Sequence, residues 1–288
     1  FGPAGGEPQL WTAQAQGDMM YAAGRDESVG MYLPVAHAQM VADGLSKRGV
    51  TDQVILSRSA WAGSQRHGVI VWSGDTHSTF EELALEIREA QSAAMAGLYW
   101  WTSDIGGFEG GNLTDPRFRE LVVRWAQFGV VSPVFRLHGD RRPSDPPSQE
   151  CGESGGGNEI WSFGPEAEKI LGGLVLLRER LRPYIHAELA KTAATGVPLL
   201  RPMIFDCAEP ACATAEAEEQ FFFGSEFIAK PVSEHGATQQ RVYLPATTAK
   251  WWRHYLTREC FRGGAWVTVA SPLEQFGLFQ ADQSCVPP

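Results

Sequence analysis

Apolar runs of strand length recur between residues 50 and 190, and each run ends in a polar residue at the start of a short loop. The runs begin at Val54, Val69, Leu98 and Val131, and in most units an amphipathic helix follows the loop. A run that is apolar on both faces suits a parallel strand covered by helices on both sides. The pattern therefore predicts an α/β fold with a parallel sheet, and four such units make half of a (β/α)8 barrel.

Helical periodicity accompanies these strand runs. Ser78 and Glu81 fit an S-x-x-E capping box, and apolar residues then recur along one helical face. An earlier helix is predicted over about residues 30–45. A longer helical region is predicted from about Pro165 to Ala194, with a break near Pro183 because proline removes a backbone donor from a helix.

The pattern changes after about Gly196. Short β-like runs separated by turn residues follow, from Phe221-Phe-Phe-Gly to Phe276-Gly-Leu-Phe, and this spacing predicts a small antiparallel β domain. We therefore expect a partial barrel that lacks its first strands over residues 1–195, and a β-sandwich-like domain over residues 196–288. Residues 139–160 read as a Pro-, Gly- and Ser-rich loop.

Composition narrows the classes of partner. The chain has 288 residues and a formal net charge of −10, which argues against nucleic acid or an anionic membrane surface as a partner. No stretch approaches the roughly 18 apolar residues of a membrane span. We therefore expect neither a nucleic acid nor a membrane partner, and the oligomeric state stays open.

The five cysteines include no CxxC pair, so neither a zinc site nor another metal site is expected, and no cofactor is implied. Cys207 and Cys212 are close enough in sequence to close a small disulfide loop. The odd count leaves at least one thiol free or paired elsewhere, and the cellular compartment stays open.

Charged residues gather where the strand runs end. Arg58, Asp75, Asp104, Arg136 and His138 follow the four runs in order. In a parallel barrel the active site lies at the carboxyl ends of the strands. Carboxylates, arginines and a histidine among aromatic residues are typical of carbohydrate chemistry, in which one carboxyl group protonates the leaving oxygen and a second acts as nucleophile or base. Aromatic faces suit the C–H surfaces of a sugar ring.

Structural roles are the alternatives for three of these residues. Asp75 could be a plain acid near a helix start, Asp104 a structural partner of Arg58 or Arg136, and His138 a loop histidine with satisfied hydrogen bonds. The sequence pattern leaves these alternatives open.

Four motifs resemble glycoside hydrolase family 31, which contains α-glucosidases and α-xylosidases. They are Arg58-Ser-Ala-Trp-Ala-Gly-Ser-Gln-Arg-His-Gly, Trp72-Ser-Gly-Asp75, Trp101-Thr-Ser-Asp104-Ile-Gly-Gly-Phe108 and Phe135-Arg-Leu-His138-Gly-Asp140. They occur in family order at plausible spacing. The resemblance implies a retaining mechanism through a covalent glycosyl-enzyme, acting on an oligosaccharide or glycoside.

The resemblance also implies a role for each matched position. It makes Asp75 the general acid/base, and the remaining matched residues contact or surround the substrate. Arg58, Asp104 and His138 match residues that hold the sugar in the −1 subsite, while Trp72, Phe108 and Arg136 match the pocket wall and its supports. The variants RSAWAGSQR and WSGD favour an α-xylosidase over an α-glucosidase.

The nucleophile is the one departure from the family pattern. The family uses the Asp of a D-x-x-E-P-like motif after the fourth barrel strand; here Glu7-Pro8 resembles the end of that motif, and Ala4 stands in the place of the acid. Asp18 and Asp26 are nearby acids without the motif around them. We therefore expect the C-terminal part of a retaining α-glycosidase without its nucleophile, and so without turnover on its own. A non-catalytic sugar-binding pseudoenzyme is the alternative.

Overall fold

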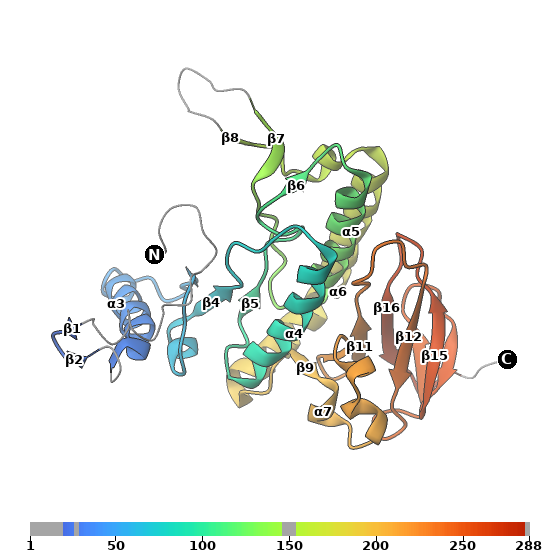
Figure 1. Cartoon of the computed structure of the whole chain (residues 1–288). Helices are drawn as coiled ribbons and strands as arrows, with labels where there is room; N and C mark the ends of the chain where they lie inside the picture. The colour runs from blue at the N-terminus through green and yellow to red at the C-terminus, as the bar shows by residue number, and fades with distance from the viewer. Residues whose placement is uncertain (1–19, 26–28, 146–153, 286–288) are drawn as a thin grey trace.

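The computed structural model describes residues 20–25, 29–145 and 154–285. Figure 1 shows helices α4, α5 and α6 between a small parallel sheet and a β domain at the C-terminal end. The α-helices are α3 (Leu33–Lys47), α4 (Phe80–Met95), α5 (Pro116–Val130), α6 (Pro165–Thr195) and α7 (Met203–Asp206). Short 3₁₀ helices are η1 (Gly30–Tyr32), η2 (Ser64–His67), η3 (Ile160–Phe163), η4 (Pro210–Ala213) and η5 (Ala215–Ala217).

Strands β3 (Ile55–Ser57), β4 (Val69–Trp72) and β5 (Trp101–Thr102) form a parallel sheet in that order. The first two predicted runs are therefore confirmed as strands, and so is the α/β class with a parallel sheet. The third run, Leu98–Trp101, is a strand only at its last residue, because β5 begins at Trp101. Two further strands near the start of the described chain, β1 (Met20–Tyr21) and β2 (Gly24–Arg25), pair with each other.

The fourth predicted strand, Val131–Phe135, is wrong as a strand. Helix α5 continues to Val130, and the backbone amides of Val131 and Ser132 are used by its last turn, donating to the carbonyls of Phe128 and Gly129 at 3.1 and 3.2 Å. Pro133 has no amide to donate to a ladder. The segment still lies beside β5, because the Thr102 hydroxyl donates to the Val134 carbonyl at 3.1 Å, and so it leads Arg136 to the same edge of the sheet.

Two helix predictions also need correction. Helix α4 begins one residue later than the Ser78–Glu81 box implies, because Thr79 is the N-cap and its Oγ1 accepts from the amide of Glu82 at 3.1 Å. Helix α6 is continuous through Pro183. Pro183 and Glu179, the residue four positions earlier whose carbonyl loses its donor, are both exposed, so water can solvate that carbonyl.

The C-terminal β domain is antiparallel, as predicted. A six-stranded sheet has the order β14-β13-β16-β11-β10-β9, and β12 and β15 form a second sheet. The strands are β9 (Leu200–Pro202), β10 (Phe221–Phe223), β11 (Phe227–Lys230), β12 (Gln239–Leu244), β13 (Trp251–His254), β14 (Cys260–Arg262), β15 (Ala265–Ala270) and β16 (Gly277–Ala281).

Strand β10 contributes to two hydrophobic cores. Phe221 and Phe223 belong to the core that also contains the apolar faces of α4, α5 and α6, whereas Phe222 belongs to a second core inside the β domain. This division follows from the alternation of side chains along a strand. One face of the six-stranded sheet therefore packs on the barrel helices.

The predicted loop of residues 139–160 contains a small β-structure. Strand β7 (Arg141–Asp145) pairs with β6 (Gly111–Asn112) in parallel and with β8 (Ser154–Gly156) in antiparallel orientation. Two disulfides lie in the C-terminal region. Cys207–Cys212 is the expected small loop and Cys260–Cys285 is a second bridge, while Cys151 lies outside the described residues.

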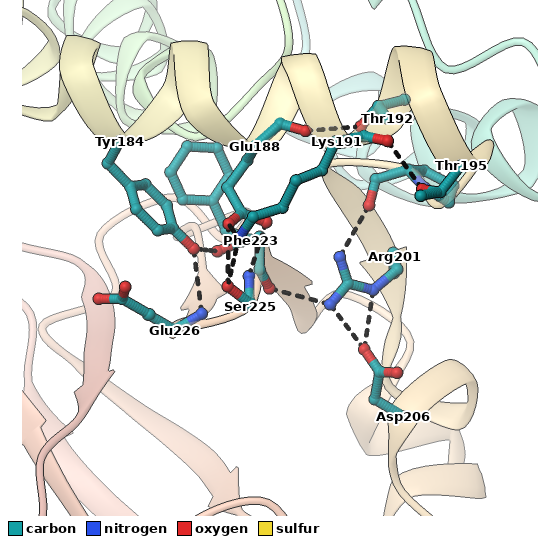
Figure 2. A network of polar contacts seen from close by, with 12 residues as sticks. Tyr184, Glu188, Lys191, Thr192, Thr195, Arg201, Asp206, Phe223, Ser225 and Glu226 are labelled. Carbon is teal, nitrogen blue, oxygen red and sulfur yellow. Dashed lines mark hydrogen bonds and ion pairs between the residues drawn. The ribbon is translucent and has the colours of Figure 1, made fainter.

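A polar network joins α6 to the β domain (Figure 2). The Glu188 carboxylate accepts hydrogen bonds from the Ser225 amide at 3.0 Å and the Ser225 hydroxyl at 2.9 Å, and it pairs with Lys191. The Tyr184 hydroxyl donates to the Phe223 carbonyl at 2.9 Å. These bonds anchor the helix to the loop that follows β10.

Arg201 completes the same junction, as Figure 2 shows. Its guanidinium donates to the carbonyls of Pro198 at 2.8 Å and Gly224 at 3.0 Å, and it pairs with Asp206 at 2.6 Å. The segment that leaves α6 is therefore bound to the first strands of the β domain.

Candidate active site

The candidate residues lie at one edge of the parallel sheet. Arg58 directly follows β3, Trp72 ends β4, and Asp104 follows β5 after one intervening residue. Asp75 follows β4 through Gly74, whose φ of +94° lets the chain turn sharply there. Because the three strands are parallel, their carboxyl ends meet at this edge.

Asp75 and Arg58 form an ion pair that stays open to solvent. Arg58 Nη2 lies 3.2 Å from Asp75 Oδ2, and the side chains are 44% and 27% exposed, respectively. A carboxyl group in this position can meet a ligand at the mouth of the strands while the arginine holds its orientation.

Asp104 is fully buried and pairs with Arg136. Arg136 Nη2 donates to Asp104 Oδ1, and the guanidinium lies 5.9 Å from the ring centroid of Trp72. Of the two arginines that the sequence offered as partners of Asp104, Arg136 forms the ion pair, whereas Arg58 pairs with Asp75. Asp104 Oδ2 has no hydrogen-bond partner in the described ranges of the chain. Burial raises the pKa of Asp104, and Asp75 adds to that effect, while Arg136 and His138 oppose it.

Phe108 and His138 lie side by side at the rim. Their ring centroids are 5.4 Å apart, and His138 is exposed. Aromatic and imidazole faces in this arrangement can pack against a sugar ring and bind its hydroxyl groups.

Backbone hydrogen bonds join the loops that carry these residues. The Phe108 amide donates to the Thr76 carbonyl at 2.7 Å, and the Asp140 amide donates to the Phe108 carbonyl at 2.8 Å. Gly107 makes this approach sterically feasible, because a Cβ at its φ of +75° would lie 2.6 Å from the His77 carbonyl oxygen. Backbone hydrogen bonds therefore join the loop of Asp75 and the loop of Asp104 into one surface.

Sequence reasoning missed two buried charged residues next to this surface. Glu86 lies on the buried face of α4, and burial raises its pKa to about 8, although the hydroxyls of Ser73 and Thr76 lower it in part. The sequence feature that could have identified Glu86 is an acidic residue among the apolar positions on one face of the predicted helix. Arg141 lies at the start of β7 and is fully buried. No pattern marked Arg141, since it sits in a polar segment beside Arg142.

Other sequence predictions fall outside this surface. Ala4, Glu7-Pro8, Asp18 and Asp26, which bear on the nucleophile, lie outside the described residues. Within residues 20–25, 29–145 and 154–285, no cluster of three or more His, Cys, Asp or Glu side chains could hold a metal ion. None of the helices in those ranges is long and apolar enough to cross a membrane.

A partial α/β barrel whose strand ends carry carboxyl, arginine and aromatic side chains suits a glycoside hydrolase. Residues 6–188 match the glycosyl hydrolases family 31 TIM-barrel domain, and residues 196–286 match the glycosyl hydrolase family 31 C-terminal domain. The chain belongs to glycoside hydrolase family 31.

Individual relatives agree with this assignment. Alpha-xylosidase A of Aspergillus niger is 35% identical over 283 residues, which cover 90% of this chain and 38% of that protein. An α-xylosidase of Saccharolobus solfataricus is 30% identical and is covered over 32% of its length. The chain therefore spans about a third of the length of these curated relatives.

Solved structures of xylosidases also resemble this chain in fold. A family 31 α-xylosidase from a soil metagenome, crystallised with xylose, superposes with a TM-score of 0.86 at 38% identity, over 94% of this chain and 41% of that one. A xylosidase from Aspergillus niger superposes with a TM-score of 0.84 at 33% identity, over 91% of this chain and 39% of that one.

Proposed function

We propose that this chain is the acid/base-bearing part of a retaining α-glycosidase that hydrolyses terminal α-linked xylosyl or glucosyl residues. The observation that carries the proposal is the solvent-accessible Asp75 carboxyl group, held by Arg58 at the carboxyl end of β4. A group that exchanges a proton with a substrate oxygen must be both reachable and oriented, and Asp75 meets both conditions.

The chemistry proceeds in two steps. In the first, the protonated Asp75 gives its proton to the glycosidic oxygen as the bond from that oxygen to C1 breaks, while a carboxylate of the complete polypeptide that is missing from this chain forms an ester bond to C1. In the second, the Asp75 carboxylate takes a proton from water, the water oxygen attacks C1, and the ester bond breaks. The sugar leaves with its anomeric configuration retained.

The other candidate residues form the −1 subsite in this proposal. Arg58, Asp104 and His138 bind sugar hydroxyls. Asp104 Oδ2 has no hydrogen-bond partner among the described residues, but it is fully buried, so a sugar reaches it only when the side chains that cover it move. Trp72, Phe108 and Arg136 form the wall, which is supported by the stacking of Arg136 over Trp72 and the approach of Phe108 to His138.

We favour a xylosyl over a glucosyl substrate. The preference is supported by the names of several relatives, two of them solved structures of xylosidases. We also propose a division into barrel and β domain at residues 195/196, supported by the end of α6 at Thr195 and by the start of the second family match at residue 196. The substrates and activity belong to the complete polypeptide in which this chain occurs.

The test is turnover by that complete polypeptide with Asp75→Asn. We expect kcat for a natural α-xyloside to fall by about 10³-fold, within the range that general acid–base catalysis contributes. Aryl xylosides with a good leaving group should lose less in the first step, and added azide should restore turnover and release a glycosyl azide with retained configuration.

Glu81→Gln is the matched control, because Glu81 is an exposed acid in the first turn of α4. Unchanged turnover in Asp75→Asn would contradict the acid/base role. A complete polypeptide that binds xylose but hydrolyses neither xylosides nor glucosides would instead identify the sugar-binding pseudoenzyme.

A further inference from the structure

Arg141 is a buried cation that the proposed chemistry does not use. Its side chain is fully buried, and it stacks on Phe118 with 5.1 Å between the guanidinium carbon and the ring centroid. Burial lowers its pKa to about 10, against the opposing effect of Asp104 and Asp140. The group therefore stays charged at neutral pH, and a charge is kept in such a place only where it is well bonded.

The guanidinium binds the loops that carry the sugar-contacting residues. Nη2 donates to the carbonyls of Ile105 at 2.9 Å and His138 at 3.0 Å, and Nη1 donates to the carbonyl of Gly107 at 2.7 Å. Ile105 and Gly107 lie between Asp104 and Phe108, so the loop of Asp104 and the loop of His138 share one cation. Nε donates to Asn158 Oδ1 at 2.7 Å, which fixes the plane of the guanidinium.

The surrounding glycines show that this space is fitted to the guanidinium. A Cβ at Gly106 would lie 3.0 Å from Arg141 Nη2, and a Cβ at Gly111 would lie 2.9 Å from Nη1. A Cβ at Gly139, next to His138, would collide with the guanidinium carbon and both terminal nitrogens. The backbone of three segments therefore approaches the cation as closely as sterics permit.

We propose that Arg141 is a positioning residue for the −1 subsite, which sets the distance between Asp104, Phe108 and His138 by binding the backbone of both loops. This inference rests on the proposed sugar-binding role of those residues. The planar fork of arginine can hold several carbonyls in fixed directions, whereas lysine offers a single ammonium. A misplacement of about 1 Å in such a site costs about 10²-fold in rate.

Arg124 provides a matched control in the same chain. It is also buried, its pKa is also lowered by burial to about 10, and it also donates to backbone carbonyls, here of Ala237, Ser271, Pro272 and Gln275 at 2.9–3.2 Å. Those carbonyls belong to the β domain. Arg124→Lys should therefore disturb folding to a similar degree without touching the strand-end loops.

The experiment compares Arg141→Lys with Arg124→Lys in the complete polypeptide, measuring kcat, KM and Tm for each. We expect similar losses in Tm, a fall of about 10²-fold in kcat/KM for Arg141→Lys, and kcat and KM within about twofold of wild type for Arg124→Lys. Equal kinetic effects in the two variants, or none in either, would overturn the proposal.

Two further measurements keep the test decisive where Arg141→Lys folds poorly. Asn158→Ala removes the Nε acceptor alone, and we expect about a tenfold fall in kcat/KM with a small change in Tm. Arg141→Ala with guanidinium at millimolar concentration should regain activity, and methylammonium should not restore it. The proposal is overturned if Asn158→Ala leaves kcat/KM unchanged and if guanidinium and methylammonium restore the activity of Arg141→Ala equally.

The failure of the proposed function would be visible separately. If the wild-type polypeptide has no turnover, xylose binding by calorimetry replaces kinetics. The positioning role then predicts a weaker xylose affinity for Arg141→Lys than for Arg124→Lys, and equal affinities would reject it.

Discussion

Two regions of the molecule contain buried charged groups. One is the junction between α6 and the β domain, and the other is the rim, by which we mean the surface around Asp75, Asp104 and the neighbouring Glu86. The two regions differ in how their charged groups are hydrogen-bonded. At the junction, the Glu188 carboxylate accepts hydrogen bonds from Ser225, and the Arg201 guanidinium donates to two carbonyls and to Asp206 (Figure 2). At the rim, Asp104 Oδ2 has no hydrogen-bond partner in the part of the chain that the structure describes, and the hydroxyls of Ser73 and Thr76 approach the Glu86 carboxyl group without regular hydrogen-bond geometry.

Under the proposed function, we interpret this difference as one between groups that stabilise the fold and groups that are kept for a ligand. A buried polar atom without a partner costs free energy, so its retention needs a reason. The junction minimises that cost, whereas the rim accepts it near Asp75 and Asp104. Three predictions test this comparison.

The largest expected effect is at the buried ion pair of the rim. Asp104→Ala leaves Arg136 without its acid, and we expect a loss of about 4 kcal/mol in the free energy of unfolding. Arg58→Ala is the control, because its pair with Asp75 is partly exposed and should cost less than about 1 kcal/mol. Urea unfolding measures both, and equal losses would show that burial does not distinguish the two pairs.

The junction should give a smaller loss in stability with no loss of function. Glu188→Ala leaves the amide and hydroxyl of Ser225 without their acceptor, and we expect about 2 kcal/mol in the free energy of unfolding. Lys191→Ala should cost under about 1 kcal/mol, since Lys191 is 59% exposed and Glu188 keeps its bonds to Ser225. A change in KM beyond about twofold in Glu188→Ala would contradict the separation of the two regions.

The third test is a dependence of stability on pH with opposite signs in the two regions. The raised pKa of Glu86 gives stability that is full below its ordinary value of 4.5 and is lost as pH rises to about 8. The slope is on the order of 1.4 kcal/mol per pH unit across that window. Burial alone would raise the pKa of Glu188, but hydrogen bonds from Lys191 and Ser225 lower it below 4.5, so its contribution is full above 4.5 and is lost at lower pH.

Glu86→Gln should therefore flatten the alkaline limb of the stability profile, and Glu188→Gln should flatten the acid limb. Unfolding free energies measured from pH 3 to pH 9 would separate the two limbs. If Glu86→Gln changes only the acid limb, the assignment of the alkaline limb to the rim is wrong.

The sequence predicted the features that depend on local pattern. Apolar runs marked the strands that end at Arg58, Asp75 and Asp104, and these residues do meet at one edge of the sheet. Family motifs then identified the architecture that the comparisons confirm. The chemical roles of these residues stay predictions.

Local pattern could not predict features that depend on distant contacts. Val131–Phe135 has strand composition, but its first amides belong to the end of α5. A proline such as Pro183 usually breaks a helix, but here the neighbouring residues Leu181 and Ile185 pack in the main hydrophobic core and the helix continues. The carbonyls that Arg141 binds belong to residues 3 to 36 positions earlier in the sequence. The local sequence pattern around Arg141 therefore could not predict these contacts.

The three phenylalanines of β10 have a consequence for the way such a protein can be recombined. Phe221 and Phe223 complete the core of the barrel helices, and Phe222 completes the core of the β domain. A chimera that joins this barrel to the β domain of another protein must therefore match both cores through one strand. The two modules therefore depend on each other for packing, because both cores share β10.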